Sequence, residues 1–205
     1  MSVRPAGADR IAELAGEPVA IALYDPKWPQ MFRDEAAHLR ECLPADLVGR
    51  IEHFGSTAVA GLAAKPIVDM LVEIDYGNGD RSSRDRPPRP MSGRIAPILV
   101  AQGYDYVWRP THGDDGPPWY AWFIKRDRSG ARTHHIHMVE RSFAEHWDRL
   151  LFRDYLIDRP DLAREYETLK QQLAAKSSCD RVAYTQDKSA FVARITAEAK
   201  RRYDR

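Results

Sequence analysis

The segment His53-Phe54-Gly55-Ser56 precedes Asp69 by twelve intervening residues, and Asp69 lies inside an apolar run. A glycine lets the backbone approach a phosphate closely, and the Ser56 hydroxyl and amides such as that of Thr57 could hold phosphate oxygens. A carboxylate on the following strand could then hold Mg²⁺ bound to those phosphates. The same residues also fit an ordinary Gly-Ser turn and an aspartate that hydrogen-bonds locally, so the spacing leaves both interpretations open.

Three histidines stand close together at positions 134, 135 and 137. On a strand, His135 and His137 face the same way and His134 faces the other way. The paired imidazoles could ligate a metal, or one could act as a general base, but both also fit apolar packing with satisfied hydrogen bonds. If this strand neighbours that of Asp69, the sequence predicts a cluster of two histidines and one carboxylate.

A second carboxylate, Glu73, follows Asp69 on the same predicted strand face. At roughly 3.3 Å per residue the two positions lie about 13 Å apart. We therefore expect Glu73 to share a metal with Asp69 only if the strand ends or bends between them.

Four cationic side chains are candidates for binding phosphate or an acidic substrate. Lys65 comes just before the Asp69 strand, Arg153 and Lys170 lie in the C-terminal part, and Lys188 follows Tyr184. The tyrosine hydroxyl could assist them. Each cation, taken singly, also fits a solvated surface position.

The hydrophobic pattern predicts the elements that must position these residues. Residues 1–17 form a leader, loose or with a short helix, and Pro29 begins a helix that ends before Pro44. Residues 77–90 are mostly turn formers and charges and predict a mobile loop. The remaining elements are strands at 18–23, 50–54, 67–74, 104–108, 119–125 and 133–140, and helices at 95–102, 142–157, 160–175 and 185–202. This order predicts an α+β class: a mixed sheet flanked by helices, with a helical end at about 142–205.

The amino-acid composition excludes some classes of function. The chain has 205 residues with 31 Lys and Arg against 30 Asp and Glu, so its net charge of +1 excludes nucleic-acid binding by bulk charge. No apolar run approaches the ~20 residues of a membrane span. Only two cysteines occur, without the spacing of a metal site, so a reduced cytoplasmic setting is expected.

The chain resembles the GrpB family over roughly residues 18–200. Tyr166, Leu169, Lys170, Tyr184 and Lys188 fit the family in the helical end, and Gly103 with Tyr104 fits it before a strand. The stretches that carry the resemblance are residues 24–29 (YDPKWP), 51–59 (IEHFGSTAV), 61–69 (GLAAKPIVD), 133–137 (THHIH) and 152–156 (FRDYL).

The family in turn is similar to the nucleotidyltransferase superfamily that includes polymerase beta, and this implies a single domain of that fold over residues 18–205. The superfamily has a Gly-Ser turn, a strand with two alternating acids, and a third acid on a neighbouring strand. Gly55, Ser56 and Asp69 match the first part, whereas Leu71 stands at the second acid. His135 or His137 would replace the third. Ala60, where the family usually has proline, is another departure.

The resemblance implies an enzyme that uses a nucleoside triphosphate such as ATP, with Mg²⁺ or another divalent metal, on a small-molecule acceptor. Gly55, Ser56, Thr57 and the four cations would bind phosphate, and Asp69, His135, His137 and Glu73 would supply metal or catalytic groups. Because two-metal chemistry needs ligands for both ions, Leu71 leaves two alternatives open. One is an ATP-dependent ligase that forms an amide; the other is a non-catalytic module that binds a nucleotide or an anionic metabolite. Neither a membrane nor nucleic acid is expected as a partner.

Overall fold

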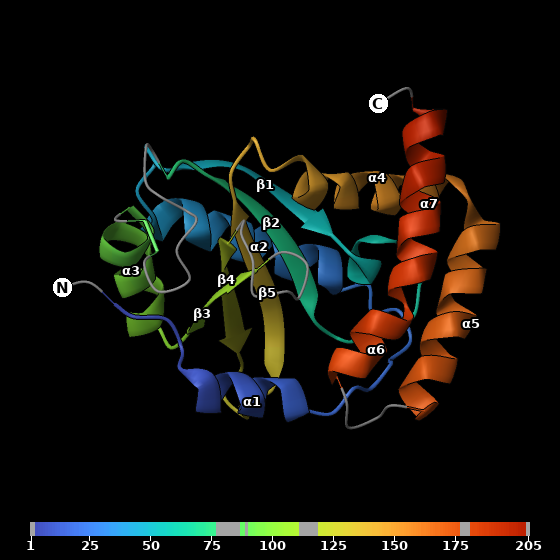
Figure 1. Ribbon diagram of the computed structural model, residues 1–205, viewed down its shortest axis with the longest axis horizontal. Helices are drawn as coiled ribbons and strands as arrows, with labels where there is room; N and C mark the ends of the chain where they lie inside the picture. The colour runs from blue at the N-terminus through green and yellow to red at the C-terminus, as the bar shows by residue number, and fades with distance from the viewer. Residues whose placement is uncertain (1–2, 77–86, 89, 111–118, 177–180, 204–205) are drawn as a thin grey trace.

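The computed structural model describes residues 3–76, 87, 88, 90–110, 119–176 and 181–203. Most of the loop expected at 77–90, and Cys179, lie outside these residues. Runs of strands and runs of helices follow one another along the chain and form one sheet with helices around it, a mixed α+β architecture (Figure 1).

A five-stranded mixed sheet forms the centre, in the order β1-β2-β5-β4-β3. The strands are β1 (Val48–Phe54), β2 (Val68–Ile74), β3 (Asp105–Pro110), β4 (Trp119–Arg126) and β5 (Arg132–Val139). Strand β2 pairs in parallel with β5, and the other neighbouring pairs are antiparallel. The interior strand β2 is apolar at most positions, because it lies between β1 and β5 and has helices packed on both faces of the sheet.

One face of the sheet packs into the larger apolar core of the protein. Helix α2 (Trp28–Cys42) and helix α3 (Ala96–Ala101), which follows the π-helix η2 (Met91–Ile95), cover this face. Val68, Met70 and Val72 of β2 and Ile136 of β5 point into it. Alternation along β2 and β5 therefore sends Asp69, His135 and His137 to the opposite face.

The opposite face is partly covered by helices from both ends of the chain. Helix α1 (Ala8–Gly16) packs Leu14 against Val107 and Ile124, and Trp147 of α4 (Ala144–Asp158) packs near Leu71. Helices α5 (Pro160–Lys176) and α7 (Ser189–Arg202) make a second apolar core with α4. Figure 1 shows these helices beside the β1 edge, with α6 (Arg181–Asp187) below them.

Two expected elements are wrong. Residues 18–23 form no strand: only Ala22 makes an isolated bridge, to Ala64, and Leu23 is 82% exposed. The helix expected at 185–202 is two helices, α6 and α7, that meet at Lys188. Among the described residues, none of the helices is both long and apolar enough to cross a membrane.

Candidate active site

The turn after β1 places Gly55 against Asp69. Gly55 has φ 74° and ψ −172°, a conformation that is essentially restricted to glycine, and the 3₁₀ helix η1 (Ser56–Ala58) follows it. A Cβ atom at position 55 would lie 2.6 Å from Asp69 Oδ2. His53 Nε2 lies 3.0 Å from the Thr57 hydroxyl oxygen Oγ1. This hydrogen bond connects the residues on either side of the turn. The Gly-Ser turn and the acid that the sequence singled out are therefore in direct juxtaposition.

His135 holds the Asp69 carboxylate from the neighbouring strand. The parallel register pairs Asp69 with His135, and His135 Nδ1 lies 3.1 Å from Asp69 Oδ1. Because an ionised carboxylate only accepts hydrogen bonds, Nδ1 is the donor and Nε2 of a neutral ring is the acceptor. Arg132 Nη1 lies 3.4 Å from that Nε2. Both ring nitrogens are engaged, so His135 orients Asp69 and has no free nitrogen for a metal or a substrate proton.

The pKa shifts of Asp69 and His135 have different physical causes. Burial alone would raise the pKa of Asp69, but the hydrogen bond and charge of His135, followed by Lys65 and Lys188, bring that pKa below its ordinary value. Burial lowers the pKa of His135 to about 4, although its hydrogen bond with Asp69 opposes the shift. At neutral pH the pair is an ionised carboxylate and a neutral imidazole.

The other two histidines of the segment lie apart from Asp69. His137 pairs with Leu71 in the register, its Nδ1 lies 3.5 Å from Arg149 Nη1, and its ring stacks on Tyr120. Burial, and then the charge of Arg149, hold its pKa well below the ordinary value. His134 lies on the opposite face, with Nε2 3.3 Å from the Met31 carbonyl oxygen, as the alternation predicted.

The expected cluster of two histidines and one carboxylate is not formed, although β2 and β5 are neighbours. No group of three or more His, Cys, Asp or Glu side chains is placed to hold a metal ion in the described part of the chain. Glu73 does not join Asp69 either, because its carboxylate forms an ion pair with Arg50 at 3.3 Å and packs against Gly49.

Two of the four expected cations face the site. The Nζ atoms of Lys65 and Lys188 lie 5.1 Å and 5.2 Å from the centre of the Tyr184 ring, and both charges act on Asp69. They come from distant parts of the chain, and Tyr184 holds them together. A phosphate group beside the Gly55 turn would therefore meet two ammonium groups.

The other two cations support the backbone of the site. Arg153 Nη1 donates to the His53 carbonyl oxygen at 2.7 Å, directly before the turn. Lys170 is buried and donates to the Ala63 carbonyl oxygen. Burial lowers the pKa of Lys170 to about 7, with a further contribution from the charge of Lys188. Neither side chain presents a free positive group to a ligand.

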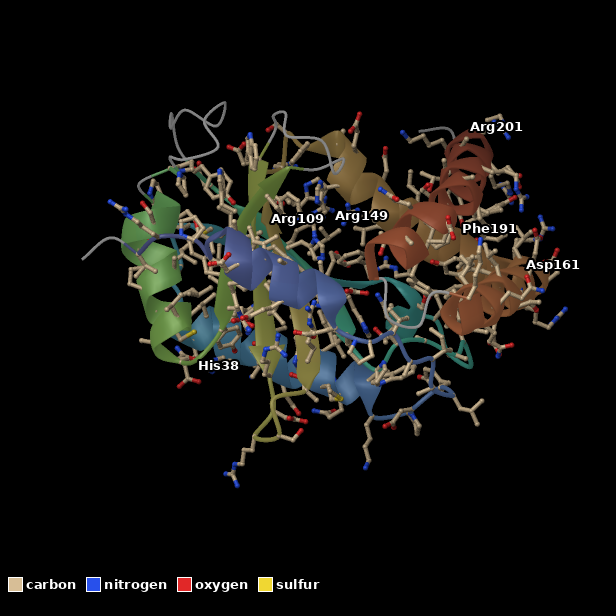
Figure 2. All side chains as sticks on the ribbon, turned by 60° about the horizontal axis from the view of Figure 1, so that its bottom comes forward. His38, Arg109, Arg149, Asp161, Phe191 and Arg201 are labelled. Carbon is tan, nitrogen blue, oxygen red and sulfur yellow. The ribbon has the colours of Figure 1, made fainter. Side chains whose placement is uncertain are left out.

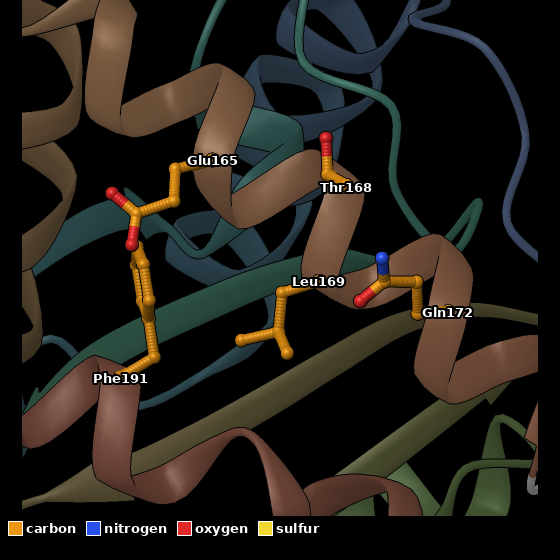
Figure 3. Close-up of a pocket in the computed structure, with 5 residues that line it drawn as sticks. All are labelled: Glu165, Thr168, Leu169, Gln172 and Phe191. Atoms are coloured by element: carbon orange, nitrogen blue, oxygen red, sulfur yellow. The ribbon is translucent and has the colours of Figure 1, made fainter.

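A hollow lies away from this site (Figure 3). Its volume is about 380 Å³, and it lies between α5 and α7, with Leu169 and Phe191 at its floor and Glu165, Thr168 and Gln172 at its rim. Glu165 forms an ion pair with Arg194 at 2.8 Å. The hollow contains none of the groups that surround Asp69, so we do not assign the chemistry to it.

Comparison with known proteins gives the family. The model of the GrpB protein family matches residues 18–198. This chain belongs to the GrpB family.

Relatives within the GrpB family cover most of the chain. The protein is 38% identical to the UPF0157 protein of Pseudomonas aeruginosa over 85% of this chain, which spans 65% of that relative. It is 32% identical to the glutamate-rich protein GrpB of Alkalihalophilus pseudofirmus, over 88% of this chain and 95% of that one. The crystal structure of the conserved protein GrpB from Enterococcus faecalis aligns with a TM-score of 0.71 at 30% identity, over 91% of this chain and all of that one.

Several residues of this GrpB-family site escape detection in the sequence. Arg132 is fixed by Glu17 and by the Leu14 carbonyl, both at 2.5 Å, and it supports His135. On α5, Glu167 accepts the Ala63 amide at 3.0 Å and the Tyr166 hydroxyl is hydrogen-bonded to Ser56. Neither Arg132 nor Glu167 belongs to a recognisable sequence motif, because the residues that each of them contacts are distant in the chain.

The donor set around Asp69 fits one Mg²⁺ shared with ligand phosphates. Mg²⁺ prefers oxygen ligands and is commonly held by one or two carboxylates, substrate phosphates and water. Asp69 supplies one ionised carboxylate, with Oδ2 directed at the Gly55 turn where phosphate would lie. The apolar side chain of Leu71 and the displaced Glu73 provide no protein ligand for a second ion.

Proposed function

We propose that this protein is a nucleotidyltransferase-like enzyme that uses a nucleoside triphosphate and Mg²⁺ to modify a small molecule. The observation that carries the proposal is the contact between the glycine turn and Asp69 Oδ2, with Lys65 and Lys188 beside it. A glycine turn, one carboxylate and two ammonium groups suit a metal-bound triphosphate in their charge and chemistry.

Each residue then has a defined task. The Gly55 turn and Ser56 would bind phosphate oxygens, and Lys65 and Lys188 would neutralise their charge. Asp69, oriented by His135, would hold Mg²⁺, which when bound stabilises the charge that develops on the phosphates. In the transfer, an acceptor heteroatom forms a bond to the α-phosphorus, the bond to the bridging oxygen breaks, pyrophosphate leaves, and a proton on the acceptor heteroatom passes to solvent.

A second candidate function is non-catalytic binding of a nucleotide or an anionic metabolite. Leu71, at the position of the superfamily's second acid, is fully buried in an apolar cluster with Phe54 and Trp147. His135 has both ring nitrogens engaged and offers no general base. These features favour a site that binds phosphate without transferring it.

Product analysis tests the proposal. The protein is incubated with ATP, GTP, CTP or UTP, Mg²⁺ and a panel of small acids, alcohols and amines, and the mixture is analysed by mass spectrometry. The proposed function predicts an acceptor that carries the nucleotide, with release of pyrophosphate, which Asp69→Asn abolishes and Glu73→Gln retains.

The alternatives give other results. An amide product with the nucleotide released would identify a ligase instead. Nucleotide binding without any product across the panel would favour the non-catalytic function.

A further inference from the structure

Two arginines lie on the same sheet face as Asp69, beyond His137. Arg109 comes from β3, and its guanidinium lies 4.9 Å from the ring centre of Trp122 and 5.9 Å from that of Tyr120. Arg149 comes from α4, with Nη1 3.5 Å from His137 Nδ1. Figure 2 shows the two labelled side chains next to each other. The strand and the helix thus direct two guanidinium groups to one place.

Neither arginine has an acidic partner in the described residues, whereas neighbouring arginines do. Arg132 pairs with Glu17, for example, and Arg153 pairs with Glu52 and Asp154. Burial lowers the pKa of Arg149 and the charge of Arg109 lowers it further, whereas Tyr120 and the charge of Asp69 oppose the shift. Two like charges held close together over aromatic rings are electrostatically unfavourable, and an anion placed against them relieves that repulsion.

We propose that Arg109 and Arg149, beside the half-buried ring of Trp122, bind a carboxylate or phosphate group of the acceptor molecule. A guanidinium offers a planar fork of donors that matches both oxyanions, and the Trp122 ring provides an apolar surface for the carbon skeleton. This inference rests on the proposed function and specifies its acceptor as a small acid.

Arg149 connects the arginine pair to the strand beside Asp69, because its Nη1 lies 3.5 Å from His137 Nδ1. His137 lies two residues beyond His135, which contacts Asp69, a separation of about 7 Å along β5. An acid held by the two arginines would extend over this distance and place its opposite end at Asp69 and the Gly55 turn. The arginines would fix the acceptor, while the lysines bind the nucleotide.

The test uses succinate and inorganic phosphate as separate probes, titrated calorimetrically into the full chain. Wild type should bind at least one of them, and the stronger probe identifies the oxyanion. Arg109→Gln should weaken that binding by about tenfold or more, because a charge-assisted hydrogen bond is lost. Arg109→Lys keeps the charge but loses the planar guanidinium. Its affinity for the probe should lie between those of wild type and Arg109→Gln. Arg128→Gln, on the exposed β4–β5 turn, is the matched control and should bind like wild type.

A parallel titration with Mg²⁺ and ATP separates this inference from the proposed function. Arg109→Gln should keep wild-type affinity for the nucleotide. Failure of wild type to bind either probe, or equal binding by Arg109→Gln, would overturn the acid subsite. Loss of nucleotide affinity in Arg109→Gln would also overturn it, by assigning the arginine to the nucleotide. An unchanged nucleotide affinity in Asp69→Asn would contradict the proposed function alone.

Discussion

Position 55 imposes two requirements that only glycine satisfies. Its backbone has a positive φ with an extended ψ, and the space where a side chain would begin is taken by the Asp69 carboxylate. The glycine therefore sets how closely the turn approaches the acid. The geometry of the proposed phosphate site depends on this single position.

Gly55→Ala should lower the free energy of unfolding by about 1–3 kcal/mol from backbone strain, and should also weaken Mg²⁺–ATP binding by displacing Asp69. Chemical unfolding and calorimetry measure the two effects. Gly130→Ala is the matched control, because Gly130 also has a positive φ, 86°, but has open space around its Cβ position. It should show strain without loss of binding. Equal nucleotide affinity in the two variants would contradict the role of Gly55.

At the scale of elements, helix α5 fixes the loop between the turn and β2. Glu167 accepts a hydrogen bond from the Ala63 amide and Lys170 donates one to the Ala63 carbonyl, so one helix satisfies both backbone polar groups of one residue. This contact places a charged group in a buried position. The stability of the protein should consequently depend on pH through Lys170.

The direction follows from proton linkage. In the unfolded chain the lysine pKa is 10.5, and burial lowers it to about 7 in the folded protein. Between these values unfolding takes up a proton, so this contribution to stability rises with pH from 7 to 10.5. Relative to Lys170→Met, wild type should gain roughly 3 kcal/mol between pH 7 and pH 10.

Urea unfolding at several pH values measures this gain. Lys176→Met, at the exposed end of the same helix, is the control and should retain the slope of wild type. The same slope for Lys170→Met and wild type would show that Lys170 is not the titrating group.

Sequence patterns predicted most elements and the placement of the Gly-Ser turn near Asp69, but not the pairings that complete the site. The alternation around residue 135 correctly separated His134 from its neighbours. The parallel register that puts His135 opposite Asp69 is a property of the whole sheet. Residues 18–23 are apolar enough for a strand, yet a strand needs a partner, and the segment bridges only at Ala22. Glu73 shares a face with Asp69, but Arg50 on β1 pairs with it.

For the whole molecule, a net charge of +1 conceals a strongly uneven distribution. The charges of Lys65 and Lys188 act on Asp69, Arg149 contacts His137 two positions along β5 from His135, and Arg109 lies beside Trp122. The N-terminal helix contributes as well, because Glu17 after α1 fixes Arg132, which contacts His135. In the proposed function, local positive charge on one sheet face, and not the total charge, would bind the anionic ligands.

The most direct measurement is calorimetric titration of Mg²⁺–ATP into wild type, Asp69→Asn and Glu73→Gln, with the other nucleoside triphosphates and with ATP lacking Mg²⁺ as comparisons. We expect Mg²⁺-dependent binding of a nucleotide by wild type and by Glu73→Gln, and its loss in Asp69→Asn. Binding that is absent from wild type, or that is the same in Asp69→Asn, would contradict a metal–nucleotide site at Asp69.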